Sequence, residues 1–311
     1  MADGSAEARY DWITAVVMHN SAAPTSREAP ETTTVVALDL GGASTQVSIP
    51  LLPGAPTAAT KSRYVQLVSL PNSKRSTELY AVSRLNYGIK EAFRHFLAFA
   101  AGGTGTRGGT VECLPRGYAG EYAPPGEVSL VRIATHAHKG TASSTAACVA
   151  QVQAWVRNME AKNTGGVGSS AAAEGIAALR GLSTFTIYAF DNYYKYTSLL
   201  STMAADATST SGSGGGKPTT VVVPLSTVHA WTAKLCALSW QELAAAYPDK
   251  DEAFLRRACF TGHYIETLLH SVYGISRTKD IHFTDSIAGF DGSWALGAAV
   301  EGMGNDLDHN T

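Results

Sequence analysis

One short segment combines the residue types that polyphosphate chemistry requires. Residues 39–46 read Asp-Leu-Gly-Gly-Ala-Ser-Thr-Gln. The consecutive glycines, Gly41 and Gly42, would let backbone N–H groups approach phosphate oxygens without an intervening Cβ atom. Asp39 follows an apolar run and could hold a hydrated divalent cation, usually through water in the case of Mg²⁺. Taken alone, the same segment can also be a simple hairpin turn.

The residues that follow the glycines could hold a water molecule. Ser44 and Gln46 are two positions apart on an expected strand, so their side chains should face the same side. Far upstream, Glu7 precedes the segment 10–14, Tyr-Asp-Trp-Ile-Thr. A glutamate near a bound phosphate could take a proton from that water. Without further support, Glu7 is more simply interpreted as an exposed residue near the N-terminus.

Hydrophobic periodicity predicts the elements that must position these residues. We expect buried or half-buried strands at 35–40, 45–49, 64–70 and 281–283. Helical spacing predicts helices at 76–101 with a break at Gly88, at 147–159, at 240–246, at 252–273 and from 293 onward. Strands alternating with helices and glycine turns favour an α/β fold.

Composition excludes several classes of protein. The chain has 311 residues, enough for about two domains, with 45% hydrophobic and 16% charged residues. The net charge is −2 and no dense basic run occurs, so nucleic acid is not an expected partner. No apolar stretch is long enough to predict a membrane span, and the first residues lack the pattern of a signal peptide.

The four cysteines, at positions 113, 148, 236 and 259, leave two interpretations open. None belongs to a CxxC pair, which gives little support for a zinc site. They could form two local disulfides in an oxidising compartment, or they could be four buried free thiols.

Several stretches of the sequence resemble the apyrase family, which comprises the nucleoside triphosphate diphosphohydrolases and the guanosine-diphosphatases. Residues 39–46 resemble the fourth signature region of that family, and residues 3–14 resemble the third, in the same order and at a similar separation. Further similar stretches lie at 79–89, 113–118, 190–194, 236–240, 259–260 and 293–298. The resemblance covers nearly the whole chain except loops at about 101–110, 160–175 and 205–220, which we expect to be flexible insertions.

The resemblance implies a role for each matching residue. Glu7 falls on the general base, Asp39 on the carboxylate of the metal–water shell, and Ser44 and Gln46 on the pair that holds the attacking water. Gly41, Gly42 and Ala43 fall on the turn that contacts phosphate, and the implied cofactor is Ca²⁺ or Mg²⁺. Tyr193 or Tyr194 falls near an aromatic residue that stacks on the nucleobase, although core packing is an alternative interpretation of both.

The resemblance also implies a disulfide pattern and a compartment. The cysteines match the two disulfides of the smaller, soluble diphosphatase branch, which pairs Cys113 with Cys148 and Cys236 with Cys259. Such a pattern implies the lumen of the secretory pathway, in the Golgi or endoplasmic reticulum, or secretion.

The chain departs from the family pattern in three ways. Ala8 stands where the family has glycine, Val16 stands where it has asparagine, and the first two signature regions are missing. The resemblance implies an actin/RNase H-like (ASKHA-type) α/β fold with a mixed sheet and two lobes. We therefore expect residues 1–288 to form the C-terminal lobe only, and residues 289–311 to form a closing helix and tail that would normally pack on the first lobe.

Three hypotheses for function follow from this interpretation. The first is hydrolysis of the terminal phosphate of nucleoside di- or triphosphates such as GDP and UDP, impaired here because one lobe is absent. The second is a truncated, non-catalytic remnant that binds nucleotide or partners, and the third is a phosphotransferase similar to sugar or acetate kinases. We expect targeting sequence, the first lobe and a membrane anchor of the parent protein to lie upstream of Met1.

Overall fold

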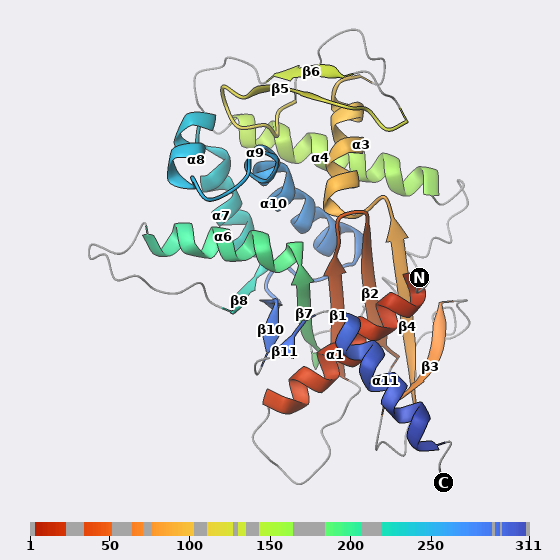
Figure 1. The fold of residues 1–311 in the computed structure, drawn as a ribbon. Coiled ribbons are helices and arrows are strands. Elements are labelled where there is room, and N and C mark those ends of the chain that lie inside the picture. The colour runs from red at the N-terminus through yellow and green to blue at the C-terminus, as the bar shows by residue number, and fades with distance from the viewer. Residues whose placement is uncertain are drawn as a thin grey trace.

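A seven-stranded mixed sheet forms the centre of the molecule in the computed structural model (Figure 1). The structure describes residues 4–22, 34–51, 64–70, 76–102, 111–126, 130–134, 143–163, 184–206, 219–287, 290–292 and 294–308. The order of strands across the sheet is β3-β4-β2-β1-β7-β9-β8. Their bounds are β1 Val35–Leu40, β2 Ser44–Pro50, β3 Val65–Ser69, β4 Ser76–Leu85, β7 Thr186–Asp191, β8 Thr220–Pro224 and β9 Asp280–Thr284.

Strand direction changes within this sheet. Strand β1 pairs antiparallel with β2 and parallel with β7, and β7 pairs parallel with β9. Two further antiparallel pairs of short strands lie outside this sheet among the described residues. They are β5 Ala119–Tyr122 with β6 Val131–Ala134, and β10 Ser286–Ile287 with β11 Phe290–Asp291.

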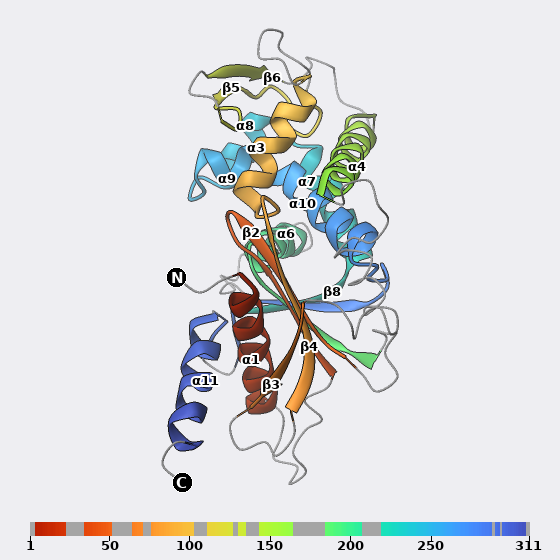
Figure 2. The same cartoon turned by 90° about the vertical axis from the view of Figure 1, so that its right-hand side faces the viewer.

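Helices cover the two faces of the sheet unequally. Helices α1 Gly4–Ala22 and α11 Trp294–Asp308 lie together on one side, as Figure 2 shows. Buried residues of many other helices share one large core with the opposite face. These helices are α3 Ile89–Ala100, α4 Ser143–Asn163, α6 Asn192–Asp206, α7 Leu225–Cys236, α8 Trp240–Ala246, α9 Glu252–Arg256, α10 Ala258–Glu266 and the π-helix η3 Thr267–Val272.

Strand β1 is apolar except for Asp39 because both of its faces are buried. Val35 and Ala37 pack with α1, whereas Val36 and Leu38 pack in the large core on the other side. A strand covered on both faces has a continuous apolar run rather than an alternating one. The sequence therefore predicted this strand correctly, with the same bounds.

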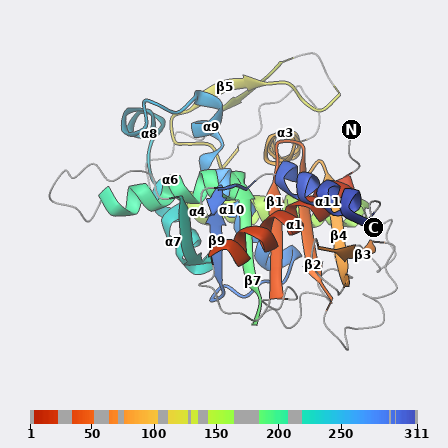
Figure 3. The same ribbon diagram turned by 60° about the horizontal axis from the view of Figure 1, so that its bottom comes forward.

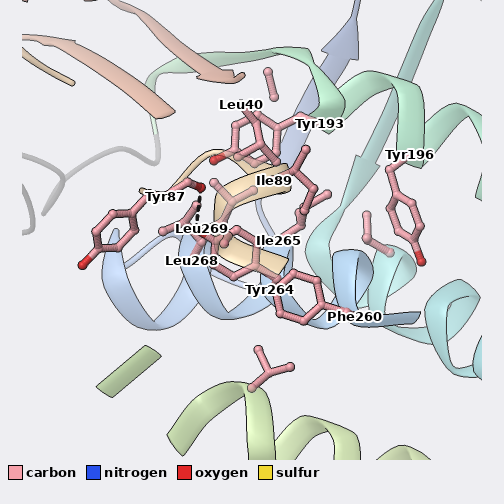
Figure 4. Packing of buried hydrophobic residues seen from close by; sticks show 14 of the residues in the cluster. Leu40, Tyr87, Ile89, Tyr193, Tyr196, Phe260, Tyr264, Ile265, Leu268 and Leu269 are labelled. Atoms are coloured by element: carbon pink, nitrogen blue, oxygen red, sulfur yellow. Dashed lines mark hydrogen bonds between the residues drawn. The ribbon is translucent and has the colours of Figure 1, made fainter. Parts of the chain in front are cut away.

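The large core is built around aromatic rings of α10. Phe260 packs against Phe96 and Trp155, with ring centroids 4.7 and 5.7 Å apart. Tyr264 stacks on Phe260, and its hydroxyl donates a 2.7 Å hydrogen bond to the carbonyl oxygen of Tyr87 (Figure 4). Burying aromatic side chains of this size contributes much of the stability of a core.

Most of the expected elements are confirmed, and one is wrong. The strands near 35–40, 45–49, 64–70 and 281–283 and the helices near 147–159, 240–246 and 293–300 are all present. The expected helix at 252–273 is divided into α9, α10 and η3.

The N-terminal half of the helix expected at 76–101 is strand β4. This strand pairs with β2 on one side and β3 on the other, so its backbone polar groups are satisfied by segments remote in the sequence. Only the second half, after the expected break at Gly88, is helical.

The loops expected to be insertions lie mostly outside the described residues. The parts that are described belong to ordered elements at their borders, namely the end of α4, the end of α6 and the start of β8. Among the described residues, no helix is both long enough and apolar enough to cross a membrane.

Helix α11 packs along α1 of the same chain, as Figure 3 shows. Leu296 and Val300 contact the apolar cluster between α1 and the sheet, and the amide of Gly297 donates a 2.9 Å hydrogen bond to Thr14 Oγ1. Trp294 is 44% exposed and stacks at 6.4 Å on Tyr10. The closing helix therefore has a packing partner within this chain, and its first residue, Trp294, remains exposed.

Candidate active site

The sequence-predicted residues of strands β1 and β2 lie beside one another in the sheet. Asp39 and Gln46 are direct cross-strand partners, and Gln46 is also opposite Ser83 of β4. Residues opposite each other across neighbouring strands project from the same face. This row of polar side chains lies on the face that α1 covers.

The side chain of Gln46 connects the predicted residues. Its amide nitrogen Nε2 lies 3.1 Å from Glu7 Oε2, 3.0 Å from Ser44 Oγ and 3.1 Å from Ser83 Oγ. The two N–H groups of the Gln46 amide are thus shared among three acceptor oxygens. The structure brings Glu7, Ser44 and Gln46 together although 37 residues separate the first from the second.

Helix α1 carries Glu7 to the sheet because small residues allow a close approach. Ala8 is fully buried, and its carbonyl oxygen accepts a 2.5 Å hydrogen bond from Ser48 Oγ. A Cβ atom on Gly4 would lie 2.5 Å from the Cβ of Ser83. Trp12 Nε1 donates to the carbonyl oxygen of Val35 at 2.9 Å and fixes the next turn of the helix. Ala8, one of the departures from the family pattern, is therefore still a small residue at a tight contact.

The phosphate-binding turn predicted at Gly41, Gly42 and Ala43 is held by the start of α3. The amides of Ile89 and Lys90 donate to the carbonyl oxygens of Gly41 and Gly42, each at 2.9 Å. The carbonyl groups of Gly41 and Gly42 are therefore occupied by the start of α3, and that of Ala43 accepts from the amide of Asn86 at 2.9 Å.

Two neighbouring glycines differ in how much room they have. A Cβ atom on Gly88 would lie 2.3 Å from the backbone nitrogen of Ser44, so only glycine fits there. At Gly42 a Cβ atom would meet the Lys90 side chain at an ordinary 3.5 Å. Close packing of the turn is thus enforced by Gly88 of the following segment more than by Gly42.

A cleft of about 440 Å³ opens beside this turn. Its lining combines acidic, small and aromatic residues: Glu7, Asp11, Asp39, Gly41, Ser44, Gln46, Asp191, Lys195, Asp285, Gly292 and Trp294. Ser44, Gln46 and Glu7 therefore face the same cavity as Asp39.

Burial makes two aspartates of this cleft, Asp39 and Asp11, difficult to ionise without a counter-charge. Burial is the main cause that raises the pKa of Asp39 to about 7, and the charge of Asp191 raises it further. Burial likewise raises the pKa of Asp11 well above its usual range, and the charges of Asp39 and Glu7 add to the effect. A cation in the cleft would remove this penalty.

The donor atoms of the cleft fit a hydrated divalent cation. Three buried oxygens of the cleft lining have no hydrogen-bond partner among the described residues: Asp11 Oδ2, Asp39 Oδ1 and Gln46 Oε1. Oxygen ligands of this kind suit Ca²⁺ and Mg²⁺. Within the described ranges, the carboxylates of the cleft do not converge as three ligand atoms within 4.8 Å, so a cation here would keep bound water.

Sequence reasoning missed three acidic residues of the cleft, Asp11, Asp191 and Asp285. Asp11 lies one helical turn after Glu7, and this i, i+4 spacing could have revealed it. Asp191 ends β7 beside Leu40, has φ +53°, and forms an ion pair with Lys195. Its position beside the cleft depends on the parallel pairing of β7 with β1, which local sequence does not reveal.

Tyr193 and Tyr194 do not line the cleft. Both are buried in the large core, at 0% and 2% exposure, and Figure 4 shows Tyr193 beside Leu40. Core packing, which the sequence left open for these residues, is what the structure shows. Buried rings cannot stack on a nucleobase in the cleft.

The two disulfides implied by the family resemblance are present. Cys113 pairs with Cys148 and Cys236 pairs with Cys259. The two pairs are adjacent in the core, since the Sγ atoms of Cys148 and Cys259 lie 3.8 Å apart.

The mixed sheet, its covering helices and the glycine turn at the end of β1 define an α/β fold of the actin/RNase H-like class. A crystal structure of nucleoside triphosphate hydrolases from Neospora caninum superposes with a TM-score of 0.53, at 15% identity, over 96% of this chain and 63% of that one.

The sequence then defines the family. Residues 1–307 match the GDA1/CD39 (nucleoside phosphatase) family, and the chain belongs to this family. Ectonucleoside triphosphate diphosphohydrolase 8 of Homo sapiens is 41% identical over 76 residues, which are 24% of this chain and 15% of the human protein. Nucleoside-diphosphatase mig-23 of Caenorhabditis elegans is 24% identical over 97% of this chain and 54% of its own length. The chain thus spans about half the length of this nematode relative.

Proposed function

We propose that this chain carries the water-activating half of an enzyme that hydrolyses the terminal phosphate of nucleoside di- or triphosphates. The observation that carries the proposal is the contact of Gln46 Nε2 with both Glu7 Oε2 and Ser44 Oγ. A base, a hydroxyl and an amide around one cleft are what is needed to position and deprotonate a water molecule.

In the proposed mechanism, Ser44 and Gln46 hold the water and Glu7 accepts its proton. The oxygen of that water attacks the terminal phosphorus in line, a new P–O bond forms, and the bond to the bridging oxygen breaks. The bridging oxygen takes the electron pair of the broken bond and leaves as part of the nucleoside mono- or diphosphate, while the attacked phosphorus leaves as inorganic phosphate. The reaction needs no covalent enzyme intermediate, because positioning and charge stabilisation supply most of the catalysis.

Asp39 and Asp11 are proposed to hold the divalent cation through water. A bound Ca²⁺ or Mg²⁺ ion supplies charge neutralisation at the phosphate oxygens. The three partnerless oxygens of the cleft favour this assignment. Gly41, Gly42 and Ala43 are proposed to contact the phosphates through backbone N–H groups.

The opposite wall of the cleft is proposed to come from a second lobe. The nematode relative is about twice as long as the aligned chain, which leaves room for such a lobe. A compartment in the secretory pathway, or secretion, agrees with the two disulfides, because disulfides persist in oxidising environments.

The test compares Glu7→Gln with the matched surface control Glu121→Gln, since Glu121 is a glutamate of the exposed β5–β6 ribbon. Phosphate release from GDP and UDP with Ca²⁺ is measured for the chain and for the protein extended by any in-frame coding sequence upstream of Met1. We expect Glu7→Gln to lower kcat by about 10²- to 10⁴-fold and the control to retain full activity.

Three results would reject the proposal in different ways. Near-normal turnover in Glu7→Gln would remove Glu7 from the mechanism. Nucleotide binding without phosphate release in both proteins would favour a non-catalytic binding function. Transfer of label from ATP to a sugar rather than to water would favour a phosphotransferase.

A further inference from the structure

A second cluster of potential ligands lies far from the cleft, between helices α7 and α10. One ring nitrogen each of His229 and His263 and one carboxylate oxygen of Glu266 lie within 4.8 Å of one another. His229 belongs to α7, whereas His263 and Glu266 are three residues apart on α10. No residue of this cluster lines the cleft described above.

The close packing of the two helices explains why these side chains meet. A Cβ atom on Gly262 would lie 2.2 Å from Thr232 Oγ1, so the helices touch at a position where no side chain fits. His229 is three residues before Thr232, and His263 and Glu266 follow Gly262. The three side chains therefore project beside the closest point of contact between the helices.

The hydrogen bonding of the cluster leaves one nitrogen available. His229 Nδ1 lies 2.6 Å from Glu266 Oε2, and Arg277 Nη2 lies 2.9 Å from Glu266 Oε1. His263 is 1% exposed, its Nε2 faces Cys236 Sγ at 3.6 Å, and its Nδ1 has no partner within the described residues. A buried imidazole nitrogen without a partner is costly unless something binds it.

We propose that His229, His263 and Glu266 form a binding site for a transition-metal cation of the Zn²⁺ type. Two imidazoles and one carboxylate with an open fourth position are an established ligand set for Zn²⁺. Ca²⁺ and Mg²⁺ prefer oxygen ligands and would favour the acidic cleft instead. The chain thus has two cation sites with different chemistry.

The surrounding residues suit this role. His229 has a side chain 47% exposed, which gives the ion a path from solvent. Arg277 keeps its contact with the second oxygen of Glu266 and orients the carboxylate. The nearby sulfurs belong to disulfides and are not ligands, because a thiolate is required. On binding, the ion replaces the proton between His229 Nδ1 and Glu266, and that proton moves to Nε2 of His229 or to solvent.

The bound ion would connect α7 to α10 next to the Cys236–Cys259 disulfide. The disulfide joins the same two helices, so the ion and the disulfide would both stabilise the interface between α7 and α10. A ligand that binds only the folded chain raises its melting temperature. We therefore expect Zn²⁺ to increase Tm.

The experiment is calorimetric titration of ZnCl₂ into untagged, chelator-treated chain in excess MgCl₂, which occupies the acidic cleft. We expect one Zn²⁺ per chain and a rise in Tm. His229→Ala, a change at an exposed position, should weaken binding at least about tenfold and abolish the rise in Tm, and Glu266→Gln should act in the same direction. Co²⁺ in place of Zn²⁺ should give the visible spectrum of a tetrahedral site without thiolate ligands.

The matched control is His136→Ala/His138→Ala, which removes the other closely spaced histidines of the sequence, both outside the described residues. This variant should bind Zn²⁺ as the unaltered chain does. Unchanged affinity in His229→Ala, or loss of binding only in the control variant, would overturn the proposal.

Discussion

At the scale of single residues, burial shifts the pKa of side chains both in the cleft and in the core. Asp39 and Asp11 share a buried space with Glu7, and burial raises the pKa of both aspartates. Elsewhere in the core the opposite occurs, because burial lowers the pKa of His263 to about 4. These shifts oppose each other in the pH dependence of stability.

We predict that the stability of the cation-free protein falls as pH rises from about 4 to about 7. Asp39 has a folded pKa of about 7, above its ordinary 3.8, so its contribution is lost over this range, and the raised pKa of Asp11 adds to the loss. His263 has a folded pKa of about 4, below its ordinary 6.5, so it acts in the opposite direction over nearly the same range and offsets part of the loss. Urea unfolding at several pH values should therefore give a free energy of unfolding that decreases towards pH 7.

Calcium separates the contribution of the aspartates from that of His263. Ca²⁺ at saturating concentration should abolish the loss of stability towards pH 7, because it compensates the ionised aspartates, and should leave the contribution of His263 unchanged. Asp11→Asn should reduce both the loss of stability with rising pH and the affinity for Ca²⁺ in a direct titration. A loss of stability towards pH 7 that Ca²⁺ does not alter would contradict the assignment of Asp39 and Asp11 to the cation.

At the scale of elements, the position of Glu7 depends on the packing of α1 between the sheet and α11. The sheet lies on one side of α1 and α11 on the other, and Arg9 of α1 forms a 3.0 Å ion pair with Glu301 of α11. A Cβ atom on Gly297 would lie 2.0 Å from the carbonyl oxygen of Tyr10. The two helices can therefore approach this closely only with glycine at 297.

Gly297→Ala is expected to push α11 away from α1 and to destabilise the protein by about 1–3 kcal/mol, as overpacked sites do. Gly302→Ala is the matched control on the same helix, because nothing lies within 4 Å of its added methyl group. This control should be neutral or slightly stabilising, since alanine favours helix more than glycine. Equal unfolding midpoints for the two variants in urea would show that the contact between α1 and α11 is not tight.

At the scale of the whole molecule, two disulfides hold the helices of the large core. One joins Cys113 to Cys148 across 35 residues and the other joins Cys236 to Cys259 across 23 residues. Cys113 and Cys148 are fully buried, whereas Cys236 is only partly buried. The pairs touch each other but differ in access to solvent.

We predict that Cys236–Cys259 is reduced before Cys113–Cys148 when the folded chain is treated with a thiol reagent, because the attacking thiolate must reach a sulfur atom. Alkylation followed by mass spectrometry would give the order. Replacing either pair with serines should lower the free energy of unfolding by about 2–4 kcal/mol. Reduction of Cys113–Cys148 first would contradict this prediction.

Much of the candidate site could be predicted from local sequence. The apolar run 35–40, the glycines after it and the spacing of Ser44 and Gln46 are features of one continuous segment, and the structure places them as expected. The strand 76–85 could not be predicted in this way, because its two neighbours are remote in the sequence. Its apolar residues also fit a helical spacing, and long-range pairing decided between the two.

The sequence by itself determined the family, the cysteine content and the residues that we propose activate water, since residue types and spacing are local properties. Only the tertiary structure decided which of them meet: that Glu7 reaches Gln46, that Asp11 and Asp191 join the same cleft, and that Tyr193 and Tyr194 do not. The physical reason is that burial and charge proximity depend on contacts between remote segments. Packing of α1 on the sheet, and of α7 on α10, creates environments that no single stretch of the chain contains.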